Sequence, residues 1–218
     1  MTKLIRAALL GLISMCAGCT AYRDVATATG AFDSTPICCA SFSDMKFVAL
    51  HVGANAVSLD IGDPAFDFGT NGKSLFKAFV LPAASVSAIS IESTEFQNGY
   101  PSKGPAIFFP SIALLDANKV LVGTIDWIHD GVLRPGDMGG AAYVKAEANL
   151  DNFPTAHFIV IYTKSANIDT THNLKFTAVP VMNGGALGYA MSSLMGGESI
   201  VPVLGSPIAP NSLSISVR

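Results

Sequence analysis

The stretch SLSISV at residues 212–217 alternates strictly between polar and apolar side chains. Successive side chains of a β-strand point to opposite faces of the sheet. The alternation therefore places Leu213, Ile215 and Val217 on one face and the three serines on the other. This pattern predicts a half-buried strand that closes the chain.

Strand-like segments recur through most of the preceding sequence. They are rich in Val, Ile, Phe and Thr, and short turn sequences such as GDP at 62–64 and RPG at 134–136 separate them. Short strands joined by close turns are typical of sandwiches. We therefore expect an all-β fold, an antiparallel β-sandwich (jelly-roll-like) with one or two short helices. The expected strands span 47–52, 56–61, 74–81, 85–93, 106–115, 120–127, 141–148 and 157–164.

Helical signals are few. Ser41 with Asp44 three residues later is a weak capping pattern, which indicates a short helical turn between residues 41 and 47. A second helix is expected after Ser165, running as far as Leu174. Residues 182–205 are rich in Gly, Ala, Ser and Met. We expect them to form a loop that packs on the sheet, and a short helix over 186–195 is the alternative.

The N-terminal 18 residues have the features of a secretory signal. Lys3 and Arg6 precede an apolar run at 7–15. That run is shorter than the roughly 20 apolar residues that a membrane-spanning helix needs, and it has the length of a signal-peptide core. These residues are therefore expected to be cleaved from the mature protein.

Two small residues, Ala17 and Gly18, stand immediately before Cys19, and the three together resemble the bacterial lipobox. The position that usually holds Leu is Cys16 here. The resemblance implies cleavage before Cys19 and lipidation of its thiol with palmitate-type chains. Thr20 in the next position implies sorting to the outer membrane, so that the protein would be periplasmic and lipid-anchored. The alternative is a signal whose cleavage releases a soluble protein.

The expected organisation is a signal peptide at 1–18, a flexible tether at 19–36 and a single β-sandwich domain at 37–218. The tether is inferred from small and polar residues with little periodicity between Thr20 and Pro36. The whole chain has 218 residues and a formal charge of −3. Without Lys3 and Arg6, eleven basic and sixteen acidic side chains remain, which gives −5. Because the scattered cations form no basic patch, nucleic acid is not expected as a partner.

Cys38 and Cys39 are adjacent. They could be two buried small residues in a turn, a passive vicinal disulfide, or a pair with a redox or metal role. Adjacent cysteines can close only a tight ring, and strained disulfides are easily reduced. A zinc site would need two further ligands, and the histidines show no paired spacing, so we expect neither a metal nor a cofactor.

Sequence motifs of catalysis are missing from the chain. It contains no Gly-x-Ser-x-Gly elbow and no His-Glu-x-x-His, and its paired glycines lack the lysine of a phosphate loop. We therefore expect a protein that is not an enzyme. An enzyme with an unfamiliar site stays as a third class, and it would gain support if two of Asp126, His129 and Asp130 converged in a cleft.

The most suggestive cluster is DWIHD at 126–130, which contains the only tryptophan of the chain. An aromatic plane can stack on the C–H face of a sugar while carboxylates bind its hydroxyl groups. The candidate ligand-binding residues are Asp126, Trp127, His129 and Asp130, with Tyr100 as a second aromatic. The competing interpretation is that Trp127 fills the core at the end of a strand.

Several segments together resemble the maltose operon periplasmic protein (MalM) family. They are the Cys38-Cys39 pair followed by FVAL at 47–50, GKSLFKAFVLP at 72–82, FFPSIALLD at 108–116, and FIVIYTK at 158–164 followed by DTT at 169–171. The order and spacing of these segments extend across nearly the whole mature chain. The resemblance implies an accessory role in maltose or maltodextrin uptake. The family provides no list of site residues, and its best-known members are soluble in the periplasm, whereas this chain has the lipobox-like segment.

The sequence thus predicts a non-catalytic envelope lipoprotein that is accessory to carbohydrate transport. Its expected partners are a maltodextrin-type carbohydrate or a component of maltose uptake, together with the membrane through Cys19. The alternative is a structural or interaction lipoprotein. Such a protein would use a strand edge or the Gly- and Met-rich loop to hold a porin or another envelope protein.

Overall fold

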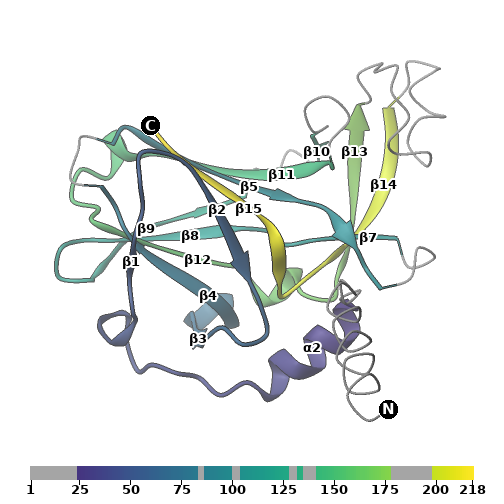
Figure 1. The fold of residues 1–218 in the computed structure, drawn as a ribbon, viewed down its shortest axis with the longest axis horizontal. Coiled ribbons are helices and arrows are strands. Elements are labelled where there is room, and N and C mark those ends of the chain that lie inside the picture. Colours follow the sequence, from purple (N-terminus) through teal and green to yellow (C-terminus); the bar gives the residue numbers. More distant parts are fainter. Residues whose placement is uncertain (1–23, 83–85, 100–103, 128–131, 135–140, 178–197) are drawn as a thin grey trace, which may run out of the picture.

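The computed structural model describes residues 24–82, 86–99, 104–127, 132–134, 141–177 and 198–218 (Figure 1). Its strands form three sheets. The central sheet has the order β1-β4-β12-β8-β9, and β3 pairs with β4 off this path. These strands are β1 (Val48–Ala49), β3 (Ala65–Asp67), β4 (Lys73–Val80), β8 (Ser111–Leu115), β9 (Leu121–Asp126) and β12 (Phe158–Tyr162).

The second sheet, here called the cover sheet, has the order β11-β5-β15-β2. Its strands are β2 (Gly53–Leu59), β5 (Ala88–Thr94), β11 (Tyr143–Asn149) and β15 (Ala209–Val217). The third, the side sheet at the right of Figure 1, has the order β10-β13-β14-β7-β6. Its strands are β6 (Phe96–Gln97), β7 (Pro105–Ile107), β10 (Val132–Leu133), β13 (Thr171–Thr177) and β14 (Glu198–Gly205).

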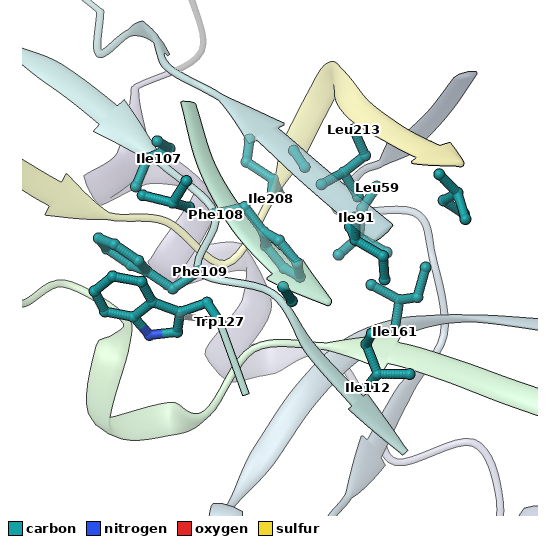
Figure 2. Packing of buried hydrophobic residues seen from close by; sticks show 14 of the residues in the cluster. Leu59, Ile91, Ile107, Phe108, Phe109, Ile112, Trp127, Ile161, Ile208 and Leu213 are labelled. Carbon is teal, nitrogen blue, oxygen red and sulfur yellow. The ribbon is translucent and has the colours of Figure 1, made fainter. Parts of the chain in front are cut away.

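The main hydrophobic core joins the central sheet to the cover sheet. Ile112 and Ile161 of the central sheet face Ile91 and Leu213 of the cover sheet in one buried cluster (Figure 2). Full burial of an aliphatic side chain contributes about 1.5–3 kcal/mol. The predicted all-β, sandwich-like fold is therefore confirmed, and most of the strand pairs are antiparallel as expected.

The closing strand follows the predicted alternation from Leu213 to Val217, whereas Ser212, beside the register shift between Ala209 and Leu213, is buried at 6% exposed. β15 lies between β5 and β2. Leu213, Ile215 and Val217 are at most 4% exposed, whereas Ser214 and Ser216 are only half-buried.

A second core lies on the opposite face of the central sheet. In β12, Ile159 and Ile161 belong to the main core, whereas Val160 and Tyr162 belong to this second cluster. Phe66 of β3 and the segment at 37–47 cover it, and Phe42 lies 5.1 Å from Phe66 between ring centroids. The central sheet is therefore buried on both faces at its inner strands, which is why β8 and β12 are nearly continuous apolar runs instead of alternating.

The predicted turn between residues 41 and 47 is confirmed as a 3-10 turn at Phe42–Asp44. The Asp44 carboxylate accepts hydrogen bonds from the backbone N–H groups of Ala40 and Ser41, at 3.1 and 3.0 Å, within a capping box. The turn holds Met45 in the second core, where this side chain is 4% exposed.

The single strand predicted over 106–115 is two strands. Pro110 separates β7, which pairs with β14 of the side sheet, from β8, which pairs with β9 and β12 of the central sheet. Proline has no N–H group for a ladder hydrogen bond. Phe108 and Phe109, both 0% exposed, fill the corner where the chain passes between the two sheets.

The helix predicted from Ser165 to Leu174 was wrong. A 3-10 turn at Ser165–Asn167 is followed by strand β13. Leu174 and Phe176 are buried while Lys175 between them is exposed, which is the period of a strand.

The loop predicted over 182–205 was also wrong for its last residues, because Glu198–Gly205 is β14 and pairs with β13 in antiparallel register. The remainder of that segment, with the alternative helix at 186–195, lies outside the described residues.

The tether predicted at 19–36 was wrong for residues 25–34, which form helix α2 (Val25–Ser34). Val25, Ala28 and Phe32 are at most 5% exposed, and the last two belong to the main core. Their spacing places them on one helix face. The Nζ of Lys73 donates to the backbone carbonyls of Phe32 and Asp33, at 2.8 and 2.9 Å, near the C-terminal end of the helix. In the described part of the chain, no helix is long and apolar enough to cross a membrane.

Candidate functional site

Trp127 fills the core at the end of β9. The residue is 3% exposed, and its ring lies 4.6 Å from Phe109 and 6.1 Å from His172 between centroids (Figure 2). An isolated bridge to Ala146 joins it to β11 of the cover sheet. A sugar ring needs an exposed aromatic face on which to stack, so the competing interpretation, Trp127 as a core residue, is the one that the structure supports.

The other predicted site residues divide into two groups. His129, Asp130 and Tyr100 lie outside the described residues, and so does Cys19. Asp126 is described and is half-buried. Because Asp126 and Trp127 are consecutive residues of an extended chain, their side chains point to opposite faces of the central sheet. The expected acidic and aromatic pair therefore does not form one surface.

Asp126 instead forms a polar cluster with residues of two neighbouring strands. Ser111 is its register partner across β8 and β9, and the Ser111 hydroxyl donates to Asp126 Oδ1 at 2.9 Å. Lys164 follows β12, the strand on the other side of β8, and its Nζ lies 2.6 Å from Asp126 Oδ2. The three residues meet because the ends of β9, β8 and β12 are aligned in antiparallel register.

Tyr162 lies on the same face, in register with Ser111. Its ring stacks on Phe68 at 3.9 Å and 8°, and its hydroxyl accepts a hydrogen bond from Asn71 Nδ2 at 3.0 Å. Burial, and next the negative charge of Asp126, raise the pKa of Tyr162 to about 12, although the Asn71 hydrogen bond acts in the opposite direction. The phenol therefore stays un-ionised at neutral pH.

The chemistry available to this cluster is binding rather than nucleophilic attack. The side chains of Asp126 and Lys164 are 35% and 32% exposed, so a carboxylate acceptor and an ammonium donor both reach solvent. The Ser111 hydroxyl is on a residue that is 0% exposed and already donates to Asp126, so a substrate carbonyl cannot approach it. We call Ser111, Asp126 and Lys164 the strand-end cluster.

Sequence reasoning identified Asp126 and missed Ser111, Lys164 and Tyr162. Ser111 and Lys164 lie in expected strands and in segments of the family resemblance, but neither was predicted as a site residue. The signal that could have found them is positional, since each stands at a strand end next to Asp126 once the order β9-β8-β12 is known. That order depends on pairing between distant segments, which a single sequence does not give.

Cys38 and Cys39 form a disulfide between adjacent residues, with the two Cα atoms 3.8 Å apart. Cys38 is exposed and donates its backbone N–H to the carbonyl of Ala65 at 2.9 Å. Cys39 is half-buried and packs against the second core. Across the described ranges, no group of three or more His, Cys, Asp or Glu residues is placed to hold a metal ion.

The fold defines the class of protein as an all-β, sandwich-like protein whose central sheet is covered on both faces. Comparisons of the chain with protein-family models, with curated proteins and with solved structures give no match.

Proposed function

We propose that this protein is a non-catalytic envelope lipoprotein, anchored through Cys19, which assists carbohydrate uptake by weak binding of a maltodextrin-type glucan. The resemblance of several segments, among them 72–82 and 108–116, to the maltose operon periplasmic protein family supports the link to carbohydrate. The small residues before Cys19 support the anchor, and two or more acyl chains suffice to hold a protein stably on a membrane.

The observation that carries the binding part is the partly exposed Asp126–Lys164 pair of the strand-end cluster. A carboxylate accepts hydrogen bonds from sugar hydroxyl groups and an ammonium donates to their oxygens, so the pair offers both halves of hydroxyl recognition. The two groups also attract each other across 2.6 Å, which keeps the donor and the acceptor at a fixed spacing. Weak binding is expected, because Trp127 supplies no stacking surface.

Titration calorimetry with maltodextrins tests the binding part. Wild-type protein is expected to release heat at millimolar sugar, and Asp126→Asn is expected to weaken binding about tenfold, the cost of roughly one charged hydrogen bond. Glu147→Gln is the matched control, because Glu147 is also ion-paired, to Lys145 at 2.9 Å and to Arg218 at 3.1 Å, but lies on β11 of the cover sheet. No heat from wild-type protein, or an equal effect of both variants, would refute the glucan site.

Metabolic labelling with a radioactive fatty acid tests the anchor. The wild-type chain should carry label and sediment with membranes, and Cys19→Ala should lose both properties. Labelling that persists in Cys19→Ala, or an unlabelled mature protein, contradicts the lipoprotein assignment without bearing on the glucan site.

An interaction role is the second candidate function, and one feature of the central sheet favours it. Val48 of the edge strand β1 is 64% exposed, and Val52 just after it is 63% exposed. Exposed apolar side chains beside a sheet edge are typical of a surface that pairs with another protein. A photo-crosslinking residue at Val52 in whole cells should then give one specific adduct with a porin or another envelope protein. The glucan proposal requires no such adduct.

A further inference from the structure

The disulfide between Cys38 and Cys39 is poorly suited to a purely structural role. In the chain-entropy account, a disulfide stabilises by restricting the unfolded chain, and the stabilisation grows with the number of residues in the closed loop. Here the sequence separation is 1, the smallest that a chain allows. The bond therefore restricts the unfolded chain very little. Closing a ring across a single peptide bond also imposes strain, which makes a disulfide easier to reduce.

The local fold is held on both sides by contacts that do not involve sulfur. Before the pair, Ile37 forms a bridge with Ala65 of β3. After it, the capping box of Ser41 and Asp44 fixes the 3-10 turn, whose Phe42 packs on Phe66. Opening the bond would leave these anchors in place. The two thiols would then stay adjacent, so that oxidation could form the same disulfide again.

The two sulfur-bearing residues differ in access. Cys38 is exposed, and so is Ile37 before it, at 51%. Cys39 is half-buried against the second core, close to the aromatic side chains that include Phe42. Thiol–disulfide exchange depends on which sulfur an incoming thiolate can reach. We therefore expect a thiolate from solution to attack the sulfur of Cys38, and the sulfur of Cys39 to be the leaving group.

We propose that Cys38 and Cys39 form a dithiol–disulfide exchange site that accepts two electrons from a dithiol, either a small molecule or a dithiol protein. A thiolate of the dithiol attacks Cys38 Sγ, the bond between the two cysteines breaks, and Cys39 leaves as a thiolate that takes up a proton. The second thiol of the donor loses its proton and attacks the donor sulfur of the mixed disulfide. Cys38 is then released as a thiol, and the donor ends as a disulfide.

This site goes beyond the proposed function and does not depend on it. Reduction with dithiothreitol, followed by alkylation and peptide mass analysis, tests it on the whole protein purified in detergent. Fluorescence of Trp127, which is buried in the main core, reports in the same samples whether the domain is folded. We expect both cysteines to become alkylated while the emission of Trp127 stays that of the folded protein, and added oxidised dithiothreitol to restore the bond. Alkylation that begins only when the emission shifts to that of unfolded protein would overturn the proposal.

The order of attack has a test of its own. One glutathione thiolate forms a mixed disulfide with one cysteine and frees the other as a thiol. Rapid acid quenching followed by alkylation of the free thiol traps this adduct before a second thiol resolves it, so fragment masses show which cysteine carries glutathione. The adduct on Cys38 should exceed the adduct on Cys39 severalfold, and an equal or reversed ratio would overturn the assignment of Cys38 as the attacked sulfur. The variant Cys39→Ser keeps the exposed cysteine and Cys38→Ser keeps the half-buried one. With oxidised glutathione, whose disulfide the protein thiolate attacks to release one reduced glutathione, Cys39→Ser should form its mixed disulfide severalfold faster. Equal rates would contradict the access argument.

Discussion

Tyr162 illustrates how one residue couples the second core to the strand-end cluster. Its ring stacks on Phe68 inside the core, and its hydroxyl end is close enough to Asp126 for the carboxylate charge to raise its pKa. Ionising this phenol in the folded state would place a second negative charge beside Asp126. The folded protein therefore binds the phenolic proton more tightly than the unfolded chain does.

This difference predicts alkaline destabilisation. The pKa of Tyr162 rises from 10.0 to about 12 on folding. The resulting stabilisation is fully present below the unfolded value and is lost as pH rises through the folded one. This difference between the folded and unfolded pKa corresponds to about 2–3 kcal/mol of stability. Urea unfolding from about pH 9 to about pH 12 should show this loss in wild-type protein and a smaller loss in Tyr162→Phe. The same pH dependence in both proteins would contradict the assignment to Tyr162.

At the scale of single residues, the sequence did not show which side chains share a face. Asp126 was predicted as a polar site residue, and the structure places it in the strand-end cluster with a partly exposed carboxylate. Trp127 was a candidate for the same surface, but the alternation of a strand places it in the core on the other face. The alternation was visible in the sequence, whereas the layer that covers each face was not.

Among the elements, α2 and β4 are joined by Lys73. Its Nζ donates to two carbonyls near the helix C-terminus and lies 4.9 Å from the centre of the Phe32 ring. The helix has no basic residue in its last turn. A lysine from another strand therefore supplies the positive charge that the helix dipole favours at this end.

The variant Lys73→Met should detach the end of α2. It keeps most of the apolar stem but removes the charged hydrogen bonds, for an expected loss of about 1–3 kcal/mol. Hydrogen exchange should quicken in the last turn of α2 while the amides of β12 stay protected. Lys46→Met removes a charge from an exposed lysine and serves as the control. Unchanged exchange in α2 would show that Lys73 does not hold the helix.

Elements with a strict period were predictable, and elements set by distant contacts were not. The closing strand was found because its alternation is local. The division of 106–115 at Pro110 depends on two different pairing partners. Gly205 is a further case: a Cβ there would overlap the carbonyl oxygen of Asn167, so the close approach of β14 to that turn requires glycine. Nothing in the local sequence distinguishes it from a glycine in an ordinary turn.

Over the whole molecule, two cores share one sheet. The main core and the second core are packed on opposite faces of β4, β8 and β12, so neither face can lose its cover without exposing the same strands. This arrangement favours a single cooperative unfolding transition. The all-β class was predictable from the local pattern of strands and turns, whereas the second layer of aromatic side chains depends on contacts between distant segments.

Cooperativity predicts that probes of the two cores report the same transition. Trp127 emission reports the main core, and near-ultraviolet circular dichroism of the stacked Tyr162 and Phe68 contributes a signal from the second. The two urea midpoints should coincide in wild-type protein. Ile215→Ala removes a fully buried main-core side chain and should lower the free energy of unfolding by about 2–5 kcal/mol. Both midpoints should then move to the same lower urea concentration. Separated midpoints would mean that the cores unfold independently.

The docked position of α2 also limits how far the domain can stand from a membrane. If Cys19 carries the proposed anchor, only residues 20–24 separate it from Val25, the first residue of the packed helix. From Cys19 to Val25 the chain takes six Cα–Cα steps, which span at most about 20–22 Å when fully extended. The anchor would then keep the α2 side of the domain within about 20 Å of the membrane surface, so that the opposite side faces away from the membrane.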